Sequence, residues 1–213
     1  MADVTVKVLE PATSFDFMTL EEAKSWLKIT DTSQDDQLQM MISVNSAIIA
    51  EMCNRTFARE KVRETWREVG NGRVFLTHWP VKEEDIETVN GAGTEYPLGG
   101  YELEEASGKL SNVSGYVEAS APWPQAVQVI YTGGFNLPDE APLPLKHATW
   151  MLMLEDRMRS LTAQFGGIRQ LSHKEARVAF FNPNEVMMKS LGAGSATMQT
   201  INSLLSHYMR LWA

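Results

Sequence analysis

TLEEAKSWLKITDTSQDDQLQMMISVNSAIIAEMCNRTF, residues 19–57, decides how the first part of this chain folds. Thr19 and Glu22 have the spacing of a capping box. In that motif the threonine oxygen accepts a hydrogen bond from the third helical N–H, and the glutamate reaches back to the cap N–H. Apolar side chains then recur at helical spacing from Leu20 to Leu27. The pattern predicts a short amphipathic helix.

A second, longer helix is predicted after the break at residues 31–33. Ser33 followed by Asp36 indicates another N-terminal cap, with acidic charge where the helix dipole favours it. Apolar residues between Leu38 and Met52 form one face, and Asn54 is a suitable stop. An ordinary helical hairpin explains this pattern as well as any specific family does.

The middle of the chain has the pattern of short β-strands. Strands are predicted at 62–69, 73–77, 86–89, around 101–103 and around 127–131, separated by glycine-rich turns. Short strands at this spacing indicate a small sandwich or a curled antiparallel sheet.

A third helix is predicted from Leu145 to Leu161, and it is apolar nearly all round. Such a helix must be buried on every side. One face would pack on the first helical pair. The other requires either a neighbouring subunit or the remaining core of a monomer, and the pattern leaves both open.

The chain becomes basic towards its C-terminal end. Residues 1–140 have a net charge of −12, whereas residues 141–213 have +4. Glycines break the segment after Thr162, and a last apolar-faced helix is predicted from Ser195 to Trp212. This segment is interpreted as an arm that docks elsewhere, the alternative being a helix that folds back on its own domain.

Motifs for catalysis, metal binding or cofactor binding are not found. His78, His147, His173 and His207 have no Cys or His partner at ligand spacing. The acidic clusters at 83–85 and 102–105 can in principle bind Mg²⁺, but solvated surface is the commoner role of such runs. No cofactor, metal or catalytic residue is therefore expected. The absence of a signal-peptide pattern and the single Cys53, on an apolar helix face, favour a reducing compartment and a packing role for that thiol.

The order of these elements resembles the head–tail connector (adaptor, head-completion) proteins of tailed bacteriophages, over residues 19 to about 160. A short helix, an acidic link and a long helix lead to Arg55-Thr56-Phe57. Trp79-Pro80, Trp123-Pro124 and the run from Tyr131 to Phe135 follow. The resemblance implies an α+β fold: a small helical bundle, an inserted antiparallel β-subdomain and an extended C-terminal helical arm. The expected segments are 1–57 (N-terminal segment and helical pair), 58–137 (β-subdomain), 138–163 (long bundle helix) and 164–213 (arm).

The resemblance also implies a structural virion protein rather than an enzyme. Subunits would form a homo-oligomeric ring, a dodecamer by resemblance, between portal and tail, extending the DNA channel and closing the filled head. The expected location is the neck of the virion, assembled in the host bacterial cytoplasm without a membrane. Expected partners are further copies of the chain, the portal protein, the next neck or tail-completion protein, and double-stranded DNA passing without specific binding.

Two sets of contact residues follow from this implied function. The subunit interface is expected at Trp150, Met151, Met153 and Leu154. Portal docking is expected at Arg177, Phe180, Phe181, Leu204, Leu205, Tyr208, Leu211 and Trp212. Two alternatives stay open. One is a DNA-packaging regulator that binds duplex through the basic C-terminal region. The other is a metal-dependent enzyme that uses the acidic β-loops.

Overall fold

The chain folds as two units in the computed structural model, which describes residues 3–69, 73–97, 99–113, 122–165, 170–173, 176–179 and 197–210. The first, here called the sheet unit, consists of Met1–Phe15 and Asn54–Ala141. The second, the helical unit, consists of Asp16–Cys53 and Pro142–Ala213. The three named α-helices lie in the helical unit together with one antiparallel hairpin, and the other strands lie in the sheet unit, so the predicted α+β class is confirmed.

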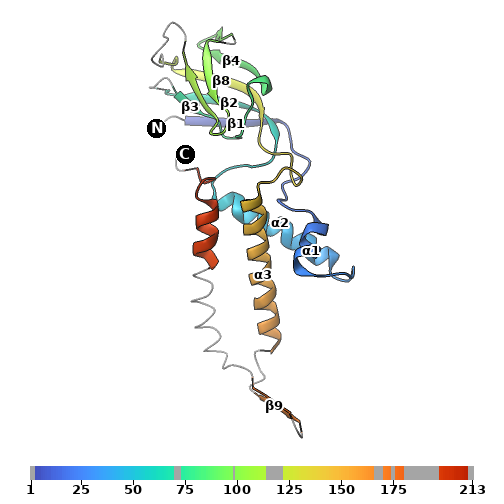
Figure 1. Cartoon of the computed structure of the whole chain (residues 1–213). Coiled ribbons are helices and arrows are strands. Elements are labelled where there is room, and N and C mark those ends of the chain that lie inside the picture. Colours follow the sequence, from blue (N-terminus) through green and yellow to red (C-terminus); the bar gives the residue numbers. More distant parts are fainter. Residues whose placement is uncertain are drawn as a thin grey trace. The chain divides into compact units, whose positions relative to one another are not determined.

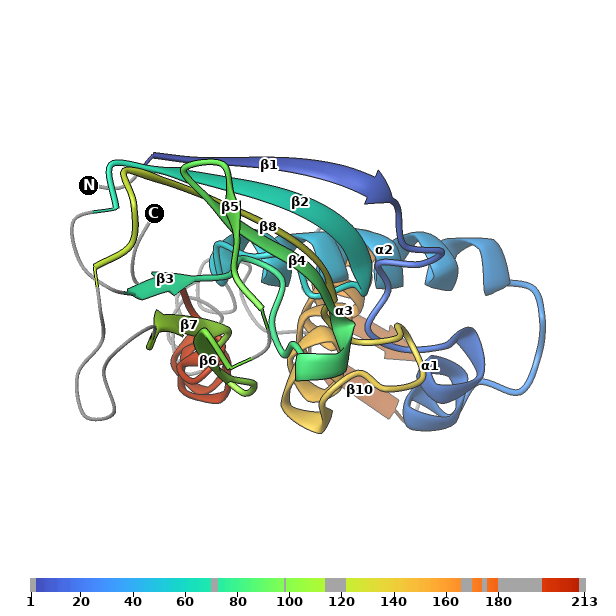
Figure 2. The same cartoon turned by 90° about the horizontal axis from the view of Figure 1, so that it is seen from above.

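Two antiparallel sheets form the sheet unit, within the described residues (Figure 2). The larger sheet has the order β1-β2-β8-β4-β5, and the smaller one has the order β3-β7-β6. The strands are β1 Asp3–Glu10, β2 Glu60–Arg67, β3 Arg73–Phe75, β4 Ile86–Gly91, β5 Thr94–Glu95, β6 Tyr101–Glu104, β7 Lys109–Asn112 and β8 Ala126–Gly133. A 3-10 turn, η1 (Glu83–Asp85), precedes β4.

Alternation of side chains explains why these segments become strands. In β2 and β8 every second residue is buried, because successive side chains of a strand point to opposite faces. Val62, Val127 and Val129 from the larger sheet meet Val74 and Leu110 from the smaller one in a single apolar cluster. The predicted strands in this region are therefore confirmed, with bounds that differ by a few residues.

Three strands of the sheet unit, β1, β5 and β7, are missing from the sequence-based prediction, and β1 is the longest of them. β1 pairs antiparallel with β2, from Asp3 opposite Arg67 to Glu10 opposite Lys61. The predicted segment 1–57 combines these residues with the helical pair, but they join the sheet. Val4, Val6 and Val8 alternate with polar residues, so the signal for a strand was present. Their pairing partner lies more than fifty residues away in sequence, beyond the reach of a local pattern.

Three named helices build the helical unit: α1 (Leu20–Leu27), α2 (Asp35–Met52) and α3 (Leu143–Phe165). The capping box of α1 is confirmed. Glu22 N donates to Thr19 Oγ1 over 3.1 Å, and Thr19 N donates to Glu22 Oε2 over 2.9 Å. The predicted cap of α2 at Ser33 is wrong. Asp31 Oδ1 accepts from both the N–H and the hydroxyl of Ser33, and α2 begins one residue later, with Gln34 as its cap.

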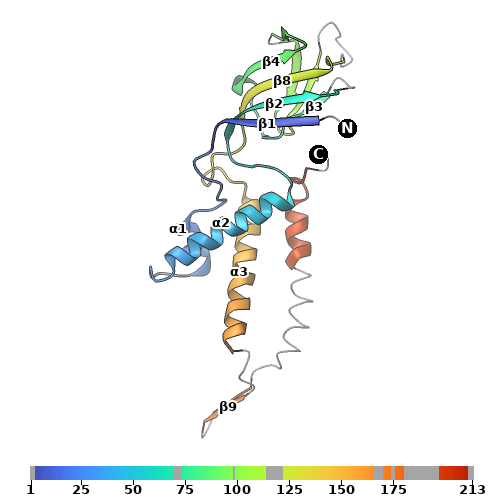
Figure 3. The same ribbon diagram turned by 180° about the vertical axis from the view of Figure 1, so that it is seen from behind.

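α2 runs across α3, and α1 packs beside both (Figures 1 and 3). Polar contacts join the helices in pairs. Lys24 Nζ lies 2.6 Å from Asp35 Oδ1, and Asn45 Nδ2 donates to Asp156 Oδ2 over 3.2 Å. The apolar core between them contains Met18, Ala23, Leu38, Ile42 and Met153.

The C-terminal region contains a hairpin and a short helix in its described parts. β9 (Gln170–His173) and β10 (Ala176–Ala179) pair antiparallel. Residues 197–205 are helical, and the turn that follows ends the helix well before Trp212. Ile201 and Leu205 are buried, and Arg210 N donates to Cys53 O over 2.9 Å. This end of the chain is thus tied to the end of α2 in its own unit. No helix in the described ranges combines the length and apolar character needed to cross a membrane.

Candidate functional site

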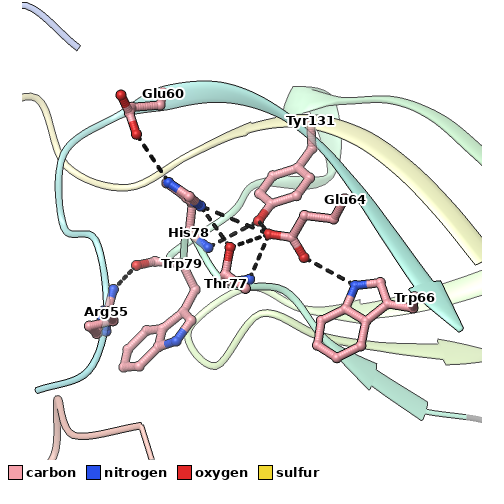
Figure 4. Close-up of polar contacts among 8 residues, drawn as sticks. All are labelled: Arg55, Glu60, Glu64, Trp66, Thr77, His78, Trp79 and Tyr131. Carbon is pink, nitrogen blue, oxygen red and sulfur yellow. Dashed lines mark hydrogen bonds and ion pairs between the residues drawn. The ribbon is translucent and has the colours of Figure 1, made fainter. Parts of the chain in front are cut away.

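A buried polar network occupies the interior of the sheet unit, centred on Glu64 of β2 (Figure 4). Glu64 Oε1 accepts hydrogen bonds from Thr77 N at 2.9 Å, from the Thr77 hydroxyl and from the Tyr131 hydroxyl. Its other oxygen accepts from Trp66 Nε1 at 3.1 Å. The carboxylate therefore joins β2, β8 and the segment after β3 at one point.

His78 extends this network to a second carboxylate. Its Nε2 lies 3.1 Å from Glu60 Oε2, and its Nδ1 lies 2.8 Å from Thr77 Oγ1. Because the Thr77 hydroxyl donates its proton to Glu64, Nδ1 must donate to Thr77. The His78 ring thus lies between two carboxylates, with Nε2 facing Glu60 and Nδ1 on the side of Glu64.

The network is closed to solvent, and this decides what it can do. His78 and Glu60 are about 5% exposed, and Glu64 and Tyr131 are fully buried. Burial raises the pKa of Tyr131 well above its ordinary value, and the adjacent Glu64 carboxylate raises it further. Tyr131 therefore stays a neutral donor. With its hydrogen bonds made internally, the network joins strands rather than presenting groups to a substrate.

Three of the motifs behind the family resemblance, around Arg55, Trp79 and Phe135, meet beside this network. The guanidinium carbon of Arg55 lies 3.3 Å from the ring centroid of Trp79 and 4.3 Å from that of Phe57, and Arg55 Nη2 donates to Trp79 O. Phe135 N donates to Phe57 O over 2.8 Å. Residues around 55, 79 and 135, far apart in sequence, thus form one cluster, here called the motif cluster.

The paired glycines of the motif cluster are required by close backbone approach. A Cβ on Gly133 would lie 1.9 Å from His78 O, and one on Gly134 would lie 2.3 Å from Ala58 O. Gly134 also has φ +105°, and its N–H donates to Pro80 O over 3.0 Å. The Gly-Gly pair therefore lets the end of β8 pass between the segments that carry Arg55 and His78.

This network is not among the predicted sites, although the sequence contains one signal for it. Glu60 and Glu64 fall on the same face of β2 as Val62 and Trp66, and that face is buried. Charged residues that share the period of buried apolar residues indicate buried carboxylates. The acidic runs at 83–85 and 102–105, which carried the alternative of a metal site, are mostly exposed. Asp85 is an exception, since it pairs with Arg59 over 2.6 Å. The described residues contain no group of three or more side chains suited to hold a metal ion.

The predicted interface residues of α3 lie in different environments. Met153 is fully buried in the core of the helical unit, so it has no surface to offer a neighbouring subunit. Trp150 and Met151 are half-buried, and Leu154 is 37% exposed. Trp150 packs against that core, stacks on His147 and meets the edge of Trp26. The interface stays a prediction, and Leu154 is the most exposed of its four residues.

The predicted portal-docking residues are only partly described. Leu204 and Tyr208 are half-buried and Leu205 is buried. Arg177 lies in β10. Phe180, Phe181, Leu211 and Trp212 lie outside the described residues. The docking site also stays a prediction.

Comparison with known proteins shows which family and which solved structures this chain resembles. The model of the head completion protein family matches residues 16–155. Among solved structures, a chain from the neck of an empty GTA (gene transfer agent) particle, computed with C6 symmetry, has a TM-score of 0.53 and 16% identity. The match covers 98% of this chain and 97% of that one. A chain from the neck of the native particle, computed with C12 symmetry, has a TM-score of 0.49 and 15% identity over 98% and 97% of the two chains. No curated protein sequence matches.

Proposed function

Because the chain belongs to the head completion protein family, as a structural protein of the head–tail neck, we propose that it forms a ring between portal and tail. That ring would extend the DNA channel and close the filled head. The observation that carries the proposal is the family match from residue 16 to residue 155, which spans both units. The likeness of fold to a neck chain whose structure was computed with cyclic symmetry supports it.

The architecture of the subunit fits a structural role. The sheet unit satisfies the buried carboxylates of Glu60 and Glu64 internally, so in the described part of the chain this network supports the strands rather than forming an open reactive site. The helical unit leaves apolar side chains such as Leu154 and Met158 exposed, which suits contact with other proteins. We therefore place subunit and portal contacts on the helical unit.

The negative charge of the chain supports the proposal that DNA passes through the ring without binding to it. Residues 1–140 have a net charge of −12, the same sign as phosphate. Tight duplex binding depends on Lys and Arg contacts to phosphates, so an acidic wall offers few points of adhesion.

Electron microscopy of the chain, alone and with its portal protein, tests the proposal. We expect a ring coaxial with the portal, and no salt-sensitive duplex affinity from residues 1–163. Replacing half-buried Leu204 and Tyr208 with Ala tests the predicted docking segment while keeping buried Ile201 and Leu205, and should leave the body folded but detached from the portal. A chain that never joins the portal would contradict the ring. Tight duplex binding at physiological salt that survives deletion of 164–213 would favour the packaging regulator instead.

A further inference from the structure

The helical unit carries exposed apolar side chains on two separate helix faces. On α2, Met40, Val44 and Ile48 are 68%, 50% and 40% exposed. They follow one another at intervals of four residues, so they form one stripe. The opposite face of α2 holds buried Leu38 and Ile42. α2 is therefore apolar on both sides, one side inside the unit and one outside.

α3 carries a second stripe. Leu143, Leu154 and Met158 are 72%, 37% and 56% exposed. At 3.6 residues per turn they point in nearly the same direction, away from buried Leu145 and Met153. Soluble monomers rarely leave contiguous apolar surface of this kind uncovered.

The α2 stripe is bordered by acids alone, whereas the α3 stripe has a base beside it. The α2 stripe is bordered by exposed Asp36 at one end and exposed Glu51 at the other, and α2 contains no Lys or Arg. Beside the α3 stripe lie one base, Arg157, and one acid, Glu155. Asp156 lies on the opposite side of α3, where it accepts a hydrogen bond from Asn45 of α2. Arg157 can therefore pair with the acids of the α2 stripe.

We propose that the α2 stripe of one subunit packs against the α3 stripe of the next copy of this chain. This inference rests on the proposed ring and specifies its contact. A closed ring of more than two subunits needs heterologous contacts, in which two different surfaces of each chain meet. The two stripes are different surfaces on one chain, they are both apolar, and Arg157 beside the α3 stripe can pair with the acids that border the α2 stripe. Contact between two α2 stripes would instead bring acids together at both ends.

Cysteine crosslinking in the portal-bound assembly tests the contact. A chain with both Val44→Cys and Leu154→Cys, treated with a short bis-maleimide, should give a ladder of dimers, trimers and larger products. Gln39→Cys with Leu154→Cys is the matched control, because exposed Gln39 lies off the stripe and bonds to Asp16. This control should give at least tenfold less product. The unmodified chain, with its buried Cys53, provides the blank.

The remaining outcomes separate the two proposals. Crosslinked dimers from Val44→Cys alone would show that α2 meets α2 and would overturn the inference. A ring visible by electron microscopy without any ladder would also overturn it, while the proposed function would stand. Absence of a ring with the portal would overturn both.

Discussion

The two units of this protein differ in how much charge they bury and in how much large apolar surface they expose. The sheet unit encloses Glu60, Glu64 and His78, and it satisfies them with hydrogen bonds between strands. The helical unit keeps large apolar side chains such as Met40 and Leu143 at its surface. A buried polar network specifies one arrangement of strands, because each donor needs its own acceptor. Exposed apolar stripes specify nothing until a partner covers them. The buried polar groups of the sheet unit are thus satisfied within the subunit, whereas the exposed apolar side chains of the helical unit are available for contact with another protein.

The largest expected effect comes from the centre of the buried network. Glu64→Ala removes the acceptor for Thr77, Tyr131 and Trp66 and leaves their donors buried without partners. We expect a loss of about 3–5 kcal/mol in the free energy of unfolding. Chemical denaturation gives the loss, and hydrogen exchange with mass spectrometry should locate the lost protection in β2 and β8. Glu102→Ala, at an exposed position on β6, is the control and should cost less than about 0.5 kcal/mol. A loss at Glu64 as small as that of the control would contradict the role given to the network.

Neighbouring residues of α3 provide the next test. Met153→Ala creates a cavity in the helical core and should cost about 2–4 kcal/mol. Leu154→Ala, one residue away but 37% exposed, should cost less than about 1 kcal/mol. Thermal unfolding of the two variants under the same conditions measures the difference. Equal losses would mean that both side chains are buried within the subunit, and the α3 stripe would no longer be an available surface.

A smaller, pH-dependent effect is expected at Glu22. Its Oε1 lies 2.6 Å from Lys146 Nζ, which ties α1 to α3. Partial burial raises the pKa of Glu22, but the hydrogen bonds from Lys146 and the Thr19 N–H, with the Lys146 charge, outweigh it and leave the pKa below the ordinary 4.5. A depressed folded-state pKa adds stability above the unfolded value, and this is lost as pH falls through the folded value. Because Gln can still complete the capping box, Glu22→Gln isolates the charge, and we expect a loss of about 1 kcal/mol at pH 7.

Denaturation of wild type and Glu22→Gln between pH 7 and pH 3 checks this sign. The gap between them should be full above pH 4.5 and should shrink as the pH falls below that value. A gap that widens towards acid would show that the pKa of Glu22 is raised in the folded chain.

The smallest effect on stability is expected at the α2 stripe. Val44 is half exposed, so Val44→Gln should change the free energy of unfolding by no more than about 0.5 kcal/mol. The same variant should weaken assembly with the portal in sedimentation experiments, because its effect lies between subunits. A stability loss comparable to that of Met153→Ala would place Val44 in the core and would remove the contrast between the two units.

Local structure was predictable wherever residues a few positions apart interact directly or follow the period of a helix or strand. Thr19 and Glu22 satisfy each other across one turn, so the capping box was readable without the rest of the chain. The strands around β2 and β8 were readable from alternation. The cap predicted at Ser33 was wrong because Asp31 Oδ1, two residues earlier, accepts hydrogen bonds from both the N–H and the hydroxyl of Ser33. A turn at Asp31 and a helix cap at Ser33 were both compatible with this stretch, and the sequence alone does not show which one forms.

The sequence by itself determined the classes of the main elements, their order and the motifs that carry the family resemblance, because these depend on periodicity and caps within a few residues. Only the tertiary structure decided which groups face inward. Met153 and Leu154 belong to one apolar run, and no periodicity separates them until α1 and α2 cover one side of α3. Likewise Glu64 becomes the centre of a network only when β8 and the segment after β3 bring Tyr131 and Thr77 to it. Such contacts join residues far apart in the chain, and their energy exists only once the chain has folded.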